Sequence, residues 1–333
     1  MDGLLERALT DGAAGLSSGL IYEPGRSAEP AEIERLAATT ARGSGFYASH
    51  IRDEGPGLLP GVEEAVGIAS RTGVGVHISH LKAAGRGRGK VSDALRLIDA
   101  AIGRGLDVTA DQYPYTASST KLGALVQGGG LWDADEPGSV LISHDPGRRF
   151  TGWTLDHVAA ERGVDALEAR TELVRDAGDE TQVVLLDRMA EEEVRRVLAH
   201  PDIAVASDGW TLSAAAGAGS HPRDFGAFAR VLGHYVRDAS LLPLALAVRK
   251  MTSVPAHRLG LAERGLLAPG AWADVVVFDP DTVAARSSLE APFEYAQGVR
   301  HVLVAGEAVI EDGEATGAAP GGVLRRVPGG WRP

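Results

Sequence analysis

Short apolar runs alternate with amphipathic runs through the first part of the chain. The runs 45–49 (GFYAS), 74–79 (VGVHIS) and 106–110 (LDVTA) are typical of buried strands. Between them, segments 58–72 and 91–104 carry apolar residues at helical spacing and predict helices. Each strand–helix unit takes about 30 residues, the usual size of a βα repeat. The pattern therefore predicts an α/β protein with a parallel sheet, of the kind found in a TIM-type (β/α)8 barrel.

The pattern becomes less regular further along the chain. Between about residues 125 and 200, charged helical stretches at 156–164 and 191–199 indicate a long insertion. A further buried strand is expected over 201–207 and a helix over 241–252. From residue 265, short strands are separated by glycine turns, and a hairpin with a loop of three to five residues is expected to turn at 305–307. We therefore expect a partial barrel over 1–264 and a small β-sandwich-like module over 265–333.

Three of the predicted strands end in groups that can bind a metal or move a proton. His50, His80 and Asp208 each follow a buried run, and the functional groups of α/β barrels gather at the carboxyl ends of the strands. One histidine alone more often satisfies a local hydrogen bond. Two of them one βα unit apart, with an aspartate, favour a zinc site on one rim. His77 lies three residues before His80, so we expect it on the opposite face in a structural role.

Further polar groups follow the same strands. Lys82 lies just past His80, and Tyr113 and Ser119 lie in the stretch DQYPYTASST after the third strand. A lysine in a loop is most often a solvated surface group, and a Tyr-Pro-Tyr sequence is equally compatible with a rigid turn of packed rings. Together, however, an ammonium and hydroxyl donors suit a substrate that carries a carboxylate.

Composition excludes several classes of function. The 333 residues carry a net charge of −12, so the chain is expected to repel phosphate backbones and to bind no nucleic acid. The absence of cysteine excludes disulfides and thiolate ligands and fits a reducing, cytoplasmic location. No run of about 18 apolar residues is present, and the first residues are too weakly apolar for a signal peptide. We therefore expect neither secretion nor a membrane partner.

Several stretches, taken in order, resemble one known family. It is the N-acyl-D-amino-acid deacylase (D-aminoacylase) family of the amidohydrolase superfamily. The similar stretches are DGAAGLSSGLIYEPG (11–25), YASHIRDEG (47–55), VHISHLKAAG (76–85), LDVTADQYPYTASST (106–120), ASDGW (206–210), SHPRDFGAFARVLGHYVR (220–237), RKMTSVPAHRLGL (249–261) and RGLLAPGAWADVVVFDP (264–280). The resemblance implies a (β/α)8 barrel with a small β-sandwich-like module, and it is weaker between about 125 and 200.

The resemblance also implies a chemistry for the strand-end residues. His50 and His80 resemble the histidines that hold a tightly bound zinc ion, and Asp208 resembles the catalytic aspartate, which we also expect to bind the metal. In such a site zinc lowers the pKa of its water towards ~7, and the aspartate acts as general base and then general acid.

The implied substrate is an N-acyl-D-amino acid, hydrolysed to a D-amino acid and a carboxylic acid. Lys82, Tyr113 and Ser119 resemble the residues that receive its carboxylate. Arg223, in SHPRDFG, could bind substrate or anchor a loop, and we leave it outside the catalytic set.

One departure from the family leaves alternatives open. The sequence has no His-x-His pair and no cysteine, which the family carries in an N-terminal segment, so the chain resembles the later two thirds of the enzyme. We therefore expect an open barrel and a metal site with fewer ligands. The alternatives are a non-catalytic fragment, or a partner of a complementary N-terminal segment or of further copies of itself. A hydantoinase-like enzyme acting on cyclic amides is less favoured, because GAAGLSSGLIY (12–22) has no metal-bridging lysine.

Overall fold

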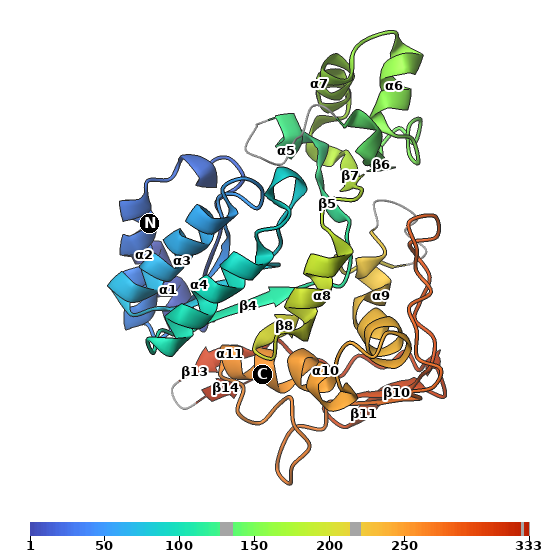
Figure 1. Ribbon diagram of the computed structural model, residues 1–333. Helices are drawn as coiled ribbons and strands as arrows, with labels where there is room; N and C mark the ends of the chain where they lie inside the picture. Colours follow the sequence, from blue (N-terminus) through green and yellow to red (C-terminus); the bar gives the residue numbers. More distant parts are fainter. Residues whose placement is uncertain (127–135, 214–220, 328–329, 333) are drawn as a thin grey trace.

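A parallel sheet of five strands lies at the centre of the protein (Figure 1). The computed structural model describes residues 1–126, 136–213, 221–327 and 330–332. The sheet has the strand order β1-β2-β3-β4-β8, and all four of its pairings are parallel. Its strands are β1 (Gly15–Gly19), β2 (Phe46–His50), β3 (Gly75–Ile78), β4 (Val108–Gln112) and β8 (Ile203–Val205).

Three helices cover one face of this sheet, side by side in Figure 1. They are α2 (Pro30–Arg42), α3 (Leu58–Thr72) and α4 (Val91–Gly103). Alternate strand residues such as Tyr47, Val76 and Val108 are buried against their apolar sides in a single hydrophobic cluster. Within the described residues, β1 and β8 pair with no strand on their outer edges. The sheet is therefore an open array of βα units, in agreement with the predicted partial barrel.

A second sheet lies apart from the first, at the top of Figure 1. Its three antiparallel strands have the order β5-β7-β6, and they are β5 (Ser118–Lys121), β6 (Val140–His144) and β7 (Gln182–Leu185). With α6 (Leu155–Arg162) and α7 (Ala166–Ala177) they enclose a hydrophobic cluster that is separate from that of the central sheet. This segment corresponds to the expected insertion, but it begins earlier, at β5.

Helix α8 (Glu191–Ala199), which was expected within the insertion, belongs to the central sheet instead. The buried carboxylate of Glu193 accepts hydrogen bonds from the backbone nitrogens of Gly89 (2.9 Å) and Val91 (3.1 Å). The carboxylate thereby supplies partners at the start of α4, where helical N–H groups have none within the helix. The apolar side of α8 also packs beside β8.

The C-terminal part forms short antiparallel sheets at the bottom of Figure 1. One has the order β12-β11-β10-β9, and β13 pairs with β14. The strands are β9 (Val275–Phe278), β10 (Val299–Val304), β11 (Glu307–Glu311), β12 (Glu314–Ala315), β13 (Arg325–Val327) and β14 (Gly330–Arg332). The β10–β11 turn has only two residues, Ala305 and Gly306, with φ of +51° and +87°. It is tighter than expected, because positive φ at both positions gives the twist that a two-residue hairpin requires.

The other elements connect or flank these sheets. The helices are α1 (Asp2–Thr10), α5 (Leu122–Val126), α9 (Arg223–Arg230), the π-helical η6 (Val231–Asp238), α10 (Leu244–Met251) and α11 (Ser253–Leu259), and the 3-10 turns are η1 (Gly25–Ser27), η2 (Gly85–Gly87), η3 (Pro137–Ser139) and η4 (Gly178–Glu180). No helix among the described residues has the length and apolar character needed to cross a membrane.

Lys250 on α10 is fully buried and stabilises the end of α8. Its ammonium donates to the carbonyl oxygens of Leu198 and of His200, the latter at 2.6 Å. We expect Lys250→Met to lower the free energy of unfolding by about 1–3 kcal/mol, because these carbonyls lose their partner. Denaturant unfolding measures this, with the exposed neighbour Arg249→Met as a control expected to change it by less than about 0.5 kcal/mol. Equal stability of the two variants would contradict this role.

Candidate functional site

A cavity of about 630 Å³ lies at the carboxyl ends of the parallel strands. Each of the five strands contributes to its wall a residue at its end or shortly after it: Tyr22 after β1, His50 of β2, His80 after β3, Tyr113 after β4 and Asp208 after β8. The second sheet closes one side with β5. The cavity thus brings together all six residues predicted from the sequence, which are His50, His80, Lys82, Tyr113, Ser119 and Asp208.

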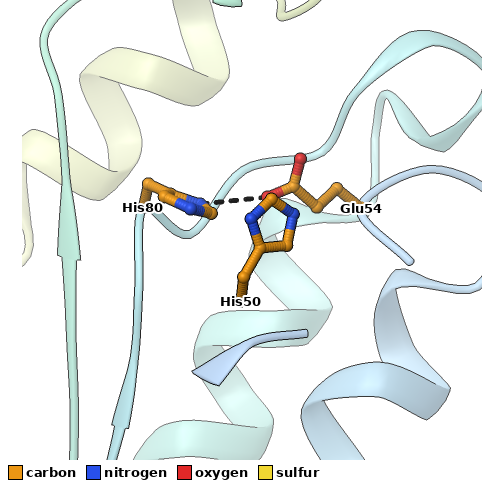
Figure 2. A group of neighbouring side chains, drawn as sticks. All are labelled: His50, Glu54 and His80. Carbon is orange, nitrogen blue, oxygen red and sulfur yellow. Dashed lines mark ion pairs between the residues drawn. The ribbon is translucent and has the colours of Figure 1, made fainter. Parts of the chain in front are cut away.

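Two histidines and one carboxylate meet at a single point of this cavity, as Figure 2 shows. The rings of His50 and His80 have their centroids 4.3 Å apart. Oε1 of Glu54, from the loop after β2, lies 3.0 Å from Nδ1 of His80 and 3.2 Å from Nε2 of His50. Among the described residues, these three offer donor atoms within 4.8 Å of one another.

The donor set fits a zinc ion. Ligands about 2.0–2.1 Å from a tetrahedral zinc lie roughly 3.3 Å from one another, close to the observed spacing between Glu54 and the two histidines. Burial lowers the pKa of His50 to about 3, so its ring is neutral and keeps a lone pair. Nε2 of His50 is buried, and although it lies 3.2 Å from Oε1 of Glu54, it makes no hydrogen bond of adequate geometry among the described residues. An unsatisfied nitrogen of this kind is what a metal ligand presents before it binds an ion.

Lys82 lies inside this group and not on the surface. Its side chain and that of Glu54 are each 5 % exposed, and Nζ lies 2.5 Å from Oε1 of Glu54 and 2.9 Å from Nδ1 of His80. Burial is the largest single influence on each group and opposes both charges, but the surrounding attractions together outweigh it. Glu54, with Tyr113 and Asp208, raises the pKa of Lys82. Lys82, with the two histidines, holds the pKa of Glu54 well below its usual range. The two groups therefore form a buried ion pair.

The backbone at His80 is held in an uncommon conformation. Its φ is +39°, in the left-handed region that side chains other than glycine rarely adopt. The side chain of Asp111 accepts the backbone N–H of His80 at 2.5 Å and contacts Nε2 of His77 at 2.9 Å, while Nδ1 of His77 contacts Thr109. This network turns the His80 ring towards the cavity after β3 has ended.

His77 has the structural role that was expected, but it does not lie on the opposite face. It is in register with Ala48 on β2, and His50 lies two residues beyond Ala48, so His77 and His50 share one face of the sheet. The opposite face was expected because side chains alternate between the two faces of a strand, and His77 and His80 are three residues apart. Because β3 ends at Ile78, that alternation does not extend to His80.

Asp208 lines the same cavity but has a different partner. Its carboxylate lies 2.9 Å from the guanidinium of Arg223, which is buried and also lies over the ring of Tyr113, 4.7 Å from its centroid. Asp208 has a φ of +49°, so a second candidate site residue adopts the left-handed conformation. Its carboxylate faces the cavity beside the group formed by the two histidines and Glu54 and is not one of that group's three donors. A metal-binding role for Asp208 stays a prediction.

The hydroxyl groups of the wall come from two different sheets. Tyr113 follows β4, is almost fully buried, and its hydroxyl has no hydrogen-bond partner among the described residues. Ser119 lies on β5 of the second sheet. An unpaired buried hydroxyl at a cavity wall is suited to a polar group of a ligand.

Three residues of the site were not among the predicted set. Glu54 lies four residues after His50 in the quoted stretch YASHIRDEG. An acidic residue this close in sequence to a candidate metal ligand could have indicated a further ligand. Tyr22 packs the edge of its ring against His50, with centroids 5.0 Å apart, and only the resemblance pointed to its segment. Arg223 was considered as a substrate or anchoring residue, and its contact with Asp208 favours the anchoring role.

Comparisons with known proteins agree with this fold. Residues 86–310 match the family described as "Amidohydrolase family". The chain is 42 % identical over 328 residues to N-acyl-D-glutamate deacylase of Alcaligenes xylosoxydans xylosoxydans, covering 98 % of this chain and 64 % of that protein. Two solved structures are 38 % identical. N-acyl-D-glutamate deacylase from Bordetella bronchiseptica, complexed with zinc and a phosphonate inhibitor, has a TM-score of 0.83, and a D-aminoacylase has 0.84. The chain spans 64 % of the length of each, with 94 % and 95 % of the chain covered.

Proposed function

The chain belongs to the amidohydrolase family, and on that premise we propose that it takes part in zinc-dependent hydrolysis of N-acyl-D-amino acids. The observation that carries the proposal is that a metal-ligand group, an aspartate and an unpaired tyrosine hydroxyl line one cavity. The similar proteins with known activities, an N-acyl-D-glutamate deacylase, a D-aminoacylase and an N-acyl-D-aspartate deacylase, support this substrate class.

The metal-binding part of the proposal rests on His50 and His80. Both rings face one point, and the burial that keeps His50 neutral preserves the lone pair that coordination needs. A zinc ion held there would supply Lewis acidity, lowering the pKa of water and polarising the amide carbonyl. Tyr22 packs against His50 in a T-shaped arrangement and restrains the plane of that ring.

Asp208 is the proposed general base and general acid. It takes a proton from the attacking water and delivers it to the nitrogen of the leaving amine, which balances the hydrolysis. The ion pair with Arg223 holds the carboxylate in one orientation at the cavity wall. Arg223 is itself fixed by its burial and by its stacking over Tyr113, so the aspartate is supported from behind.

The carboxylate of the substrate is proposed to bind Lys82, Tyr113 and Ser119. The hydroxyl of Tyr113 and the ammonium of Lys82 lie on one side of the cavity, with Lys82 Nζ 5.5 Å from the centroid of the Tyr113 ring. Ser119 offers a hydroxyl from the second sheet. Hydrolysis of cyclic amides has less support, because the edge strand β1 (GLSSG) carries no lysine that could bridge metals.

The proposal is tested with the purified chain loaded with zinc. N-acetyl-D-glutamate and N-acetyl-D-methionine are expected to release their D-amino acids, and the L-enantiomers are not. Chiral chromatography of the free amino acids measures this release. A chelator should abolish the activity and added zinc should restore it. Release of D- and L-amino acids at equal rates, or no release by the zinc-loaded chain, would show that the proposed function is wrong.

A further inference from the structure

Lys82 has two roles that one position cannot fulfil. In the structure its ammonium is bound to Glu54 within the group of candidate metal ligands, whereas the proposed function needs it beside the substrate carboxylate. We propose that Lys82 exchanges partners when the metal binds: Glu54 becomes the third metal ligand, and the released ammonium turns into the cavity. This inference rests on the proposed function only for the identity of the group that Lys82 then binds.

The first argument is that a single oxygen atom is shared. Oε1 of Glu54 lies 2.5 Å from the Lys82 ammonium and 3.0 and 3.2 Å from the nitrogens of the two histidines. The distances from Oε1 to the two histidine nitrogens suit three ligands around one zinc ion. An oxygen that coordinates a divalent ion is a weaker hydrogen-bond acceptor for an ammonium, so Lys82 and the metal compete for Oε1 of Glu54.

The second argument is repulsion between like charges. Nζ of Lys82 lies 2.9 Å from Nδ1 of His80. An ion bound to that nitrogen at about 2 Å would be at most about 5 Å from the ammonium. Because the side chains of Lys82 and His80 are only 5 % and 11 % exposed, water screens this repulsion poorly. Lys82 therefore gains from moving away as the ion enters.

The third argument is that the cavity offers Lys82 another place. In its present position Nζ already lies 5.5 Å from the centre of the Tyr113 ring, whose face attracts an ammonium and can draw it further into the cavity once Glu54 is lost as a partner. Asp208 adds a negative charge on the same side and favours the charged form of Lys82. The flexible four-carbon stem of a lysine allows the ammonium to reach this side without movement of the backbone. Only the metal-loaded protein would then present a free ammonium to a carboxylate.

Lysine labelling tests the exchange in the unmodified protein, since the chain has only four lysines, Lys82, Lys90, Lys121 and Lys250. Each is read separately by mass spectrometry after reductive methylation, with and without zinc. We expect Lys82 to be protected in the metal-free protein and labelled severalfold faster when zinc is bound. Lys250, which is fully buried on α10, should stay protected in both states, and the exposed Lys121 should react in both. Unchanged labelling of Lys82 in protein shown to bind zinc would overturn the exchange.

Zinc affinity gives the second measurement, by competition with a chromophoric chelator. Lys82→Met is expected to bind zinc about tenfold more tightly or better, because a competing like charge is removed. Glu54→Gln is expected to bind it at least about tenfold more weakly, and Lys90→Met, outside the cavity, should match the wild type. Equal or weaker binding by Lys82→Met would contradict the proposal.

The two proposals fail in different ways. Zinc binding and lysine labelling can be measured without turnover. If zinc binds and exposes Lys82 to labelling but no N-acyl-D-amino acid is hydrolysed, the partner exchange is supported and the proposed function is wrong. Absence of any zinc binding by the wild type and by Lys82→Met would overturn the exchange together with the metal-dependent part of the function.

Discussion

Asp208→Asn is expected to lower kcat for N-acyl-D-amino acids by about 10²–10⁴-fold, the usual contribution of a positioned general acid–base. Asparagine keeps the shape of the side chain but neither takes nor delivers the proton. Asp208 is not one of the three donors gathered at the histidines, so the zinc content of the variant tests its predicted metal-binding role separately from its acid–base role. KM should change little, since the substrate carboxylate is proposed to bind elsewhere. Steady-state kinetics with N-acetyl-D-glutamate, together with zinc content, measures both expectations.

The matched control for this variant is Asp202→Asn. Asp202 is an exposed aspartate that pairs with Arg249 at 3.7 Å. It lies outside the cavity, so its replacement should leave kcat unchanged. Thermal melting checks that Asp208→Asn is folded, because the change leaves the buried Arg223 without its charged partner. A folded Asp208→Asn variant with wild-type kcat would show that another group moves the proton.

His80→Ala is expected to remove both metal binding and activity. Loss of a group that only supports a metal ligand lowers metal affinity by ~10–100-fold. His80→Ala removes a proposed ligand itself, so its zinc affinity should fall by more than this. His80 is also one of the three groups around the Glu54 oxygen, so its removal opens that side of the site to water. Zinc bound per chain, measured by elemental analysis after dialysis, gives the result.

The control for His80→Ala is His157→Ala. His157 is exposed on α6 and lies outside the cavity, so its removal should change neither zinc content nor hydrolysis. Retention of one zinc per chain with unchanged affinity by His80→Ala would contradict the assignment of His80 as a ligand. In that case the position of the ring beside Glu54 would reflect packing alone.

The parts of the site that follow from strand order could be predicted from the sequence. Parallel strands end on the same edge of a sheet, so His50 and His80, one βα unit apart, were expected to be neighbours, and they are. The helices over 58–72 and 191–199 have the predicted bounds, because their apolar spacing is regular and a proline or an acidic run marks their first turns.

The parts that depend on backbone turns could not be predicted. Glu54 reaches the histidines through the path of a loop, and the sequence pattern contains no rule for that path. The inward turn at His80 depends on an unusual φ held by Asp111, which is 31 residues away. For the same reason the face of His77 was predicted wrongly, and the Lys82–Glu54 ion pair was not foreseen. Each of these contacts depends on segments that are brought together only in the folded chain.

The second sheet has a consequence for how this enzyme family diversifies. The wall formed by β5 and β7 includes Ser119, Thr120 and Gln182, and it is supported by its own hydrophobic cluster. The histidines are supported by the central cluster. Substitutions beneath the second sheet can therefore shift this wall, and the described contacts pass such a shift to His50 through Tyr22, whose hydroxyl lies 3.2 Å from that of Thr120. For the proposed hydrolysis, this wall is therefore the side of the cavity at which substitutions would change substrate preference while the central cluster keeps His50 and His80 together.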